Sequence, residues 1–177
     1  AVKLHAQVKD RLADIERIVL TTHESAIRII SKTGKLYNYA DRDHCLQYMV
    51  AIGLIHGTLN ADHYLDAAAA DPRIDRLRET MDVGEDARYS RDYLDPDKRS
   101  IANAIQIHFK DGSSTQKIEV EYPIGHRRRR QEGLPLLIEK FRSSLTTRMQ
   151  SQRVQQILEL CQDRERLAKT PVPDFMS

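Results

Sequence analysis

The 177-residue sequence has little of what marks disulfide-rich, metal-binding or membrane-spanning proteins. Its two cysteines, Cys45 and Cys161, are too few for a cysteine metal-ligand cluster and indicate a reducing compartment. No apolar run approaches the roughly 20 residues that a transmembrane helix needs, and the first residues lack the apolar region of a signal peptide. The sequence therefore predicts no bound metal and no membrane partner.

Charge of one sign is also lacking. Lysine and arginine number 28 against 26 aspartates and glutamates, which gives a net charge of +2. An excess this small does not indicate a nucleic-acid partner. With 40% hydrophobic and 31% charged residues, the chain is typical of a soluble globular protein, and its length suits one domain with a buried core over residues 1–177.

Apolar and polar residues alternate in four short stretches, which predicts β-strands at residues 16–22, 81–83, 104–110 and 117–122. The last two flank the turn pair Asp111-Gly112, so we expect a hairpin. Helical spacing of apolar residues predicts helices at residues 24–32, 43–56, 73–80, 134–145 and 151–167. The polar stretch 84–98 indicates a long loop. The pattern predicts an α+β fold, a two-layer sandwich in which a mostly antiparallel sheet of about four strands packs against helices.

The helix predicted at residues 43–56 is the candidate functional element. An aspartate at position 41 or 43 can cap its first turn. His44, Gln47 and Tyr48 stand at i, i+3 and i+4, which predicts one shared face roughly opposite the apolar one. Three hydrogen-bonding side chains at the positive end of a helix dipole suit a carboxylate or a phosphate. On spacing alone, solvated surface is the favoured interpretation.

Four blocks of the sequence carry a resemblance to a known family. One block, residues 39–52, contains the run Asp41-Arg42-Asp43-His44-Cys45-Leu46-Gln47-Tyr48. The others are residues 22–30, 98–105 and 120–131, the last of which contains the run Tyr122-Pro123-Ile124-Gly125-His126. In their order and spacing these blocks resemble the MmgE/PrpD family over nearly the whole chain, and specifically its methylcitrate branch.

This resemblance implies a single lid-like domain at the C-terminal end of a longer two-domain enzyme. Members of the family carry a helical domain before the matching region, so that N-terminal domain is an expected partner, and a homodimer stays open. The implied reaction is the dehydration of 2-methylcitrate to 2-methyl-cis-aconitate in propionate catabolism, without a cofactor. The fragment is expected to be inactive alone. The implied location is the mitochondrial matrix in a eukaryote or the cytoplasm in a bacterium. Similarity to fungal members favours the mitochondrial matrix.

Such a reaction needs a base, an acid and groups that hold carboxylates. Tyr48 and His44 are the predicted catalytic residues, since related family members have a tyrosine on this helix at the substrate pocket. Arg42 can form a bidentate pair with a carboxylate. Arg42 and Gln47 are therefore predicted to bind the tricarboxylate substrate, while the division between base and acid stays open.

Five basic residues follow one another from His126 to Arg130. The first interpretation is a solvated loop or an interdomain salt-bridge patch. In a second interpretation, Arg127 and Arg129 bind substrate carboxylates. Nucleic-acid binding is only weakly indicated, because the run has no interleaved aromatic residues. The alternative to a dehydratase is a non-catalytic module that binds an anionic polymer or a protein through Arg127, Arg128, Arg129 and Arg130.

Overall fold

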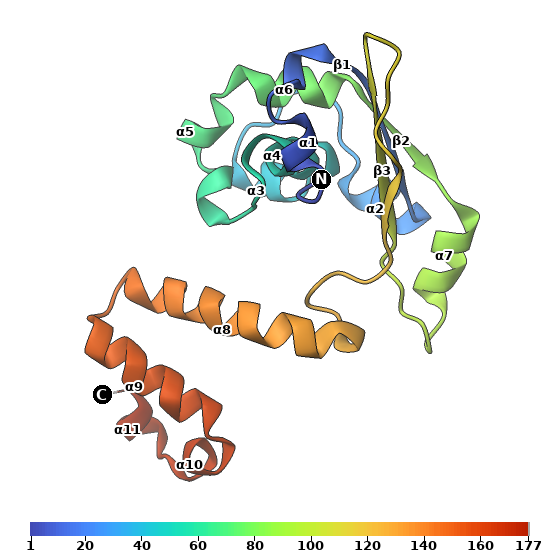
Figure 1. Cartoon of the computed structure of the whole chain (residues 1–177). Coiled ribbons are helices and arrows are strands. Elements are labelled where there is room, and N and C mark those ends of the chain that lie inside the picture. Colours follow the sequence, from blue (N-terminus) through green and yellow to red (C-terminus); the bar gives the residue numbers. More distant parts are fainter. Residues whose placement is uncertain (177) are drawn as a thin grey trace. The chain divides into compact units, whose positions relative to one another are not determined.

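The computed structural model describes residues 1–176, and its contacts divide the chain into two compact units (Figure 1). Unit 1 comprises Ala1–Pro123, and unit 2 begins at Ile124. The sequence predicts one domain over residues 1–177. The boundary follows a proline, which has no N–H group to extend a strand ladder, so the sheet ends where the second unit starts.

Unit 1 is built on a four-stranded sheet in the order β2-β1-β3-β4. The strands are β1 (Ile15–Thr22), β2 (Met81–Glu85), β3 (Asn103–Phe109) and β4 (Ile118–Val120). β1 runs parallel to β2 and antiparallel to β3, and β3 runs antiparallel to β4. The predicted α+β fold with a mostly antiparallel sheet of four strands is confirmed, and so is the hairpin that joins β3 to β4.

Short helices fill the connections of unit 1. Before the sheet come α1 (His5–Val8) and η1 (Leu12–Asp14). Between β1 and β2 lie α2 (Glu24–Ile30), α3 (Tyr39–Asp43), α4 (Leu46–His56), η2 (Ala61–Tyr64), α5 (Asp66–Ala69) and α6 (Pro72–Glu79). Parallel strands need a long crossover, and this helical segment supplies it. α4 stops at Gly57, whose left-handed φ of +68° favours glycine.

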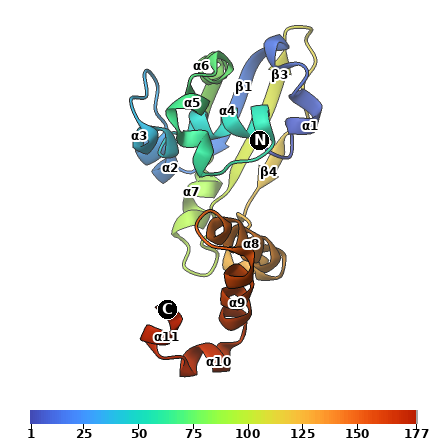
Figure 2. The same ribbon diagram turned by 90° about the vertical axis from the view of Figure 1, so that its left-hand side faces the viewer.

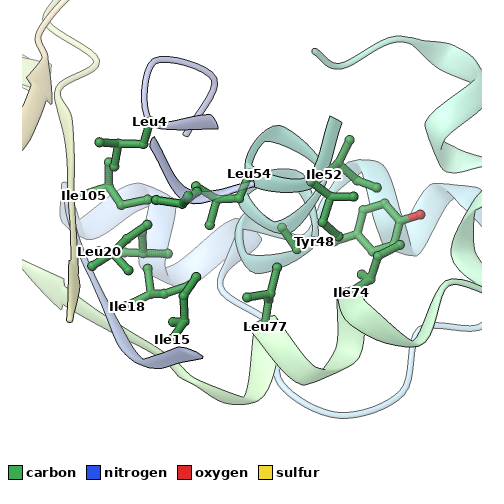
Figure 3. Close-up of a cluster of buried hydrophobic side chains, with 14 of the residues drawn as sticks. Leu4, Ile15, Ile18, Leu20, Tyr48, Ile52, Leu54, Ile74, Leu77 and Ile105 are labelled. Atoms are coloured by element: carbon green, nitrogen blue, oxygen red, sulfur yellow. The ribbon is translucent and has the colours of Figure 1, made fainter. Parts of the chain in front are cut away.

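The centre of the hydrophobic core is α4. Helices α1, α3 and α6 contact it, and the views in Figures 1 and 2 place it between these helices and one face of the sheet. Its residues Ile52 and Leu54 are 0% exposed and belong to one buried cluster with Ile18 of β1 and Leu77 of α6 (Figure 3). Each such side chain contributes about 1.5–3 kcal/mol when fully buried, so this helix is the element that holds unit 1 together.

One helix of unit 1 contradicts the sequence prediction. The stretch 84–98, predicted as a loop, contains α7 (Ala87–Leu94). The Asp86 carboxylate caps it by accepting the Arg88 N–H at 2.8 Å, and Tyr89 is 1% exposed in a small cluster with Ala102 and Ala104. This helix lies on the side of the sheet opposite α4 (Figure 1). The loop prediction is wrong because it followed the polar composition and Pro96 of the stretch, although Tyr89 and Tyr93 stand one helical turn apart in α7.

Unit 2 is helical. It contains η3 (Arg127–Arg129), α8 (Arg130–Thr146), α9 (Ser151–Gln162), α10 (Arg164–Lys169) and α11 (Val172–Met176). The single helix predicted at 151–167 is interrupted at Asp163, whose carboxylate accepts the Arg166 N–H at 2.9 Å and so starts α10. Among the described helices, none has both the length and the apolar character that crossing a membrane demands.

Candidate functional site

The helix predicted at residues 43–56 is present as α4, but α4 begins only at Leu46, and a separate short helix, α3, ends at Asp43. Between them Cys45 has an extended backbone and a fully buried side chain. Asn38 caps α3 by accepting the Asp41 N–H at 2.9 Å, so the first helix starts and ends before the second. His44 therefore lies outside α4, and the predicted shared face is wrong.

The face of α4 that carries Gln47 and Tyr48 is buried, although spacing alone favours solvated surface. These two residues are 3% and 2% exposed, and Leu54 of the apolar face is 0% exposed. Because other helices and the sheet surround α4, its polar side chains are enclosed as well. Polar residues on such a helix must find partners within the protein.

Tyr48 finds its partner in the segment that follows α4. Its hydroxyl donates to the His63 carbonyl oxygen at 2.7 Å, and its ring stacks on Tyr64 with centroids 6.2 Å apart. Burial raises the pKa of Tyr48, and the nearby Arg42 guanidinium opposes part of that rise. The phenol therefore carries its proton at neutral pH, which suits a hydrogen-bond donor or an acid.

Arg42 is buried, with a side chain only 8% exposed. Its Nη1 donates to the Tyr64 carbonyl oxygen and its Nη2 to the Asp66 carboxylate, both at 2.7 Å. A guanidinium can make two such bonds at once because its N–H groups form a planar fork. In this structure both hydrogen bonds of the Arg42 guanidinium go to acceptors of the same chain.

Gln47 joins α4 to the segment after α2. Its Oε1 accepts the Lys32 N–H at 3.1 Å, and its Nε2 donates to the Ser31 hydroxyl at 3.0 Å. Both ends of the side-chain amide are thus engaged within unit 1. The predicted role of Gln47 in substrate binding stays a prediction.

His44 is the exposed member of the set, with a side chain 62% exposed. Its Nδ1 lies 2.5 Å from the Asp43 carboxylate. A carboxylate at one ring nitrogen fixes the orientation of an imidazole and leaves the other nitrogen for proton exchange. The arrangement is chemically suited to a general acid or base.

Tyr64 links these groups and was missed in the sequence. Its ring stacks on Tyr48, its carbonyl oxygen accepts from Arg42, and burial together with the Asp43 charge raises its pKa. The signal that could have found it is Asn60, a residue type favoured at helix N-termini; its side chain accepts the Asp62 N–H at 3.1 Å and starts the turn that contains Tyr64. The structure thus brings Arg42, Tyr48 and Tyr64 together.

The two predicted arginine ligands belong to unit 2. Arg127 and Arg129 lie in η3, and Arg129 forms an ion pair with Glu132 at 2.8 Å. The His126 ring accepts the Arg128 N–H at 3.1 Å and caps this turn. The predicted solvated loop is therefore a short 3₁₀ turn that leads into α8.

Unit 1 has a surface hollow that Tyr48 does not line. It has a volume of about 520 Å³ and is lined by Arg17, Asp82, His108 and neighbours on the sheet. Within residues 1–176 no group of three histidine, cysteine or acidic side chains is arranged to hold a metal ion.

Sequence comparisons decide the family. A model of the MmgE/PrpD C-terminal domain matches residues 1–164. The chain belongs to the MmgE/PrpD family. It is similar to the 2-methylcitrate dehydratase of Escherichia coli (strain K12), with 51% identity over 164 residues that make up 93% of this chain and 34% of that relative. It is 55% identical to the mitochondrial 2-methylcitrate dehydratase of Yarrowia lipolytica over 161 residues, 89% of this chain and 31% of that protein.

A third relative, the probable 2-methylcitrate dehydratase of Saccharomyces cerevisiae, is 50% identical over 145 residues, which cover 82% of this chain and 28% of the relative. The chain therefore spans about a third of the length of the relatives it matches, at 34% of the first. The resemblance of the four sequence blocks to the MmgE/PrpD family is confirmed, and the match is to its C-terminal domain.

Proposed function

We propose that this chain is the C-terminal part of a 2-methylcitrate dehydratase, a hydro-lyase that converts 2-methylcitrate to 2-methyl-cis-aconitate. The observation that carries the proposal is identity of 50–55% to proteins of that name over most of the chain. The reaction would serve propionate catabolism through the methylcitrate cycle.

The elimination has a simple balance. A base removes a proton from the carbon next to the hydroxyl-bearing carbon, the C–O bond breaks, and an acid protonates the departing hydroxyl to give water. Tyr48 carries its proton at neutral pH and is proposed as a donor at the substrate, where its O–H would turn from the His63 carbonyl oxygen to the substrate. His44, with its ring oriented by Asp43, is proposed as the second proton-transfer group. Positive groups such as Arg127 and Arg129 would hold carboxylates.

The proposed partner of this chain is the preceding part of a longer enzyme. The relatives are about three times longer than the region they share with this chain, which is 34% of the first relative. The apolar residues of α8 support a partner surface, because Leu134, Leu137 and Phe141 are 50%, 60% and 36% exposed. A lid-like role for this chain against that N-terminal domain is part of the proposal, and a homodimer is a further arrangement to test.

The cellular location of the enzyme depends on whether its source is a eukaryote or a bacterium. One relative is named as mitochondrial. We propose the mitochondrial matrix for this enzyme in a eukaryote and the cytoplasm in a bacterium.

The test compares a full-length enzyme that contains this sequence with the 177-residue chain alone. Both are incubated with 2-methylcitrate and a chelator, and the unsaturated product is followed by its ultraviolet absorbance. We expect turnover by the full-length enzyme and little or none by the chain alone, because groups from the preceding domain are needed. Absence of turnover in the full-length protein would overturn the proposal.

A second function, a non-catalytic anion-binding module, is favoured by four successive arginines from Arg127 to Arg130. Binding of RNA that weakens steeply with salt would support it, because phosphate contacts release counterions. Absent or salt-insensitive binding by the same protein would count against this module.

A further inference from the structure

The side chains of Arg42 and Tyr48 converge on one segment of the chain, residues 60–66. Arg42 donates to the Tyr64 carbonyl oxygen and Tyr48 to the His63 carbonyl oxygen, each at 2.7 Å. We propose that Arg42 is a positioning residue that clamps this segment against Tyr48 and thereby fixes the Tyr48 hydroxyl for the reaction. The inference rests on the proposed function and assigns Arg42 a different part in it from substrate binding.

The shape of the segment is set locally. Asn60 accepts the Asp62 N–H, and the His63 ring accepts the Asn60 N–H, both at 3.1 Å. Residues 58–62 are exposed. The conformation of the turn is therefore held by hydrogen bonds within it. Its position relative to the core depends on side chains of α3 and α4 that contact it.

Arg42 and Tyr48 are those side chains. They hold two consecutive carbonyl groups, and the Tyr64 ring stacks on Tyr48 from the same segment. If the guanidinium is removed, the Tyr64 carbonyl loses its donor and the segment can shift together with its His63 carbonyl. The Tyr48 hydroxyl would then lose the acceptor that orients it, and misplacement of a reacting group by about 1 Å can cost about 100-fold in rate.

The geometry favours positioning over direct substrate contact. The Arg42 side chain is 8% exposed, and each of its terminal nitrogens donates one hydrogen bond to the chain, one to the Tyr64 carbonyl oxygen and one to Asp66. Asp66, in contrast, is 91% exposed, so its ion pair with Arg42 is the weaker of the two attachments.

The test is a double-mutant cycle in the full-length enzyme with Arg42→Met and Tyr48→Phe. Methionine keeps much of the buried volume and removes the donors. For Arg42→Met alone we expect kcat to fall about 10- to 100-fold with KM within about twofold. In the Tyr48→Phe background the same change should lower kcat by less than about threefold, because the hydroxyl that Arg42 positions is already absent.

The matched control is Arg78→Met. The Arg78 side chain is 9% exposed and donates to the Gly34 carbonyl oxygen at 2.7 Å and to Asp75, so it is a buried guanidinium of the same kind that holds a different segment. Because the Arg78 charge also acts on the Tyr48 hydroxyl, this control is judged by the hydrogen exchange of residues 60–66 and not by kcat. Arg42→Lys, which keeps the charge and one donor, should restore part of the kcat that Arg42→Met loses.

A second readout does not depend on activity. Amide hydrogen exchange of residues 60–66 should be faster in Arg42→Met and in Tyr48→Phe than in Arg78→Met. If the wild-type enzyme has no dehydratase activity, the proposed function fails, and the exchange rates alone then decide whether the clamp exists. Equal exchange in the Arg42 and Arg78 variants would overturn the clamp. So would independent losses of kcat in the cycle, or a rise in KM with kcat unchanged, which marks a substrate ligand.

Discussion

Units 1 and 2 differ in how they cover their apolar side chains. In unit 1, α4 is enclosed by helices and by the sheet, and its residues Ile52 and Leu54 are 0% exposed. In unit 2, α8 has the same helical spacing of apolar residues, yet Leu137 is 60% exposed and Phe141 is 36% exposed. An amphipathic helix needs a partner for its apolar side. The helical spacing of apolar residues therefore indicates that a helix has a packing partner, but not whether that partner lies in the same part of the chain.

The largest expected effect tests the enclosed helix. Leu54→Ala should lower the free energy of unfolding of the 177-residue chain by about 2–5 kcal/mol, because it opens a cavity in a packed core. Leu137→Ala on the exposed side of α8 is the matched control, and we expect a change within about 0.5 kcal/mol. Urea unfolding followed by circular dichroism measures both. Equal losses in the two variants would erase the contrast between the units.

The next prediction tests whether the apolar side of α8 is buried in a longer enzyme. If α8 packs against the preceding part of the chain, Leu137→Ala should destabilise the full-length protein by about 2 kcal/mol or more, as expected for a buried leucine. Lys140→Ala, a surface change on the same helix, serves as control. Unfolding of the full-length variants by urea provides the measurement. A neutral Leu137→Ala in both proteins would mean that the face stays exposed.

Tyr48→Phe probes whether the enclosed helix of unit 1 also carries chemistry. The change removes one hydrogen bond to the His63 carbonyl, so we expect a loss of stability of about 1 kcal/mol. In the full-length enzyme kcat should fall about 100-fold, as for the loss of a proton-transfer group. Steady-state kinetics with 2-methylcitrate check this. Unchanged kinetics would remove Tyr48 from the site and leave it as a core residue.

The smallest effect concerns pH. Glu119 of β4 accepts hydrogen bonds from the Tyr89 hydroxyl and from Arg88, and these lower the pKa of its carboxyl. A lowered pKa in the folded state gives stability that is present above the pKa of the unfolded chain and is lost as pH falls through the folded value. The side chain is 37% exposed, so the effect is small.

Thermal unfolding between pH 7 and pH 3 measures this effect. The fall in Tm should be smaller in Glu119→Gln than in the wild type. The control in unit 2 is Glu139→Gln, whose carboxylate is 3.7 Å from Arg142 and 72% exposed, and it should leave the pH dependence unchanged. An identical fall in the wild type and Glu119→Gln would contradict the linkage.

Much of the fold could be predicted because its signals are local. Alternation along β1 and β3 marks strands, Asp111-Gly112 marks the hairpin turn, and Gly57 has the left-handed backbone that ends a helix. α7 escaped prediction because its sequence is mostly polar and its apolar face has few residues, among them the buried Tyr89.

The candidate site could be predicted only in part. The sequence selected Arg42 and Tyr48, and the structure brings both against one segment. The sequence also predicted that His44 shares a helix face with Tyr48, and this is wrong because α4 begins only after Cys45. Tyr64 was missed because its contacts join residues 16 and 22 positions apart, and no spacing rule along one helix reaches that far.

Motifs and periodicity are properties of neighbouring residues, so the family, the α+β class and the positions of the strands could be predicted from the order of residues alone. The buried side of α4, the division of the chain into units and the partners of Arg42 became known only from the folded chain. Those features depend on contacts between elements that are far apart in the sequence. A polar side chain such as Gln47 can lie in the core when distant partners satisfy it.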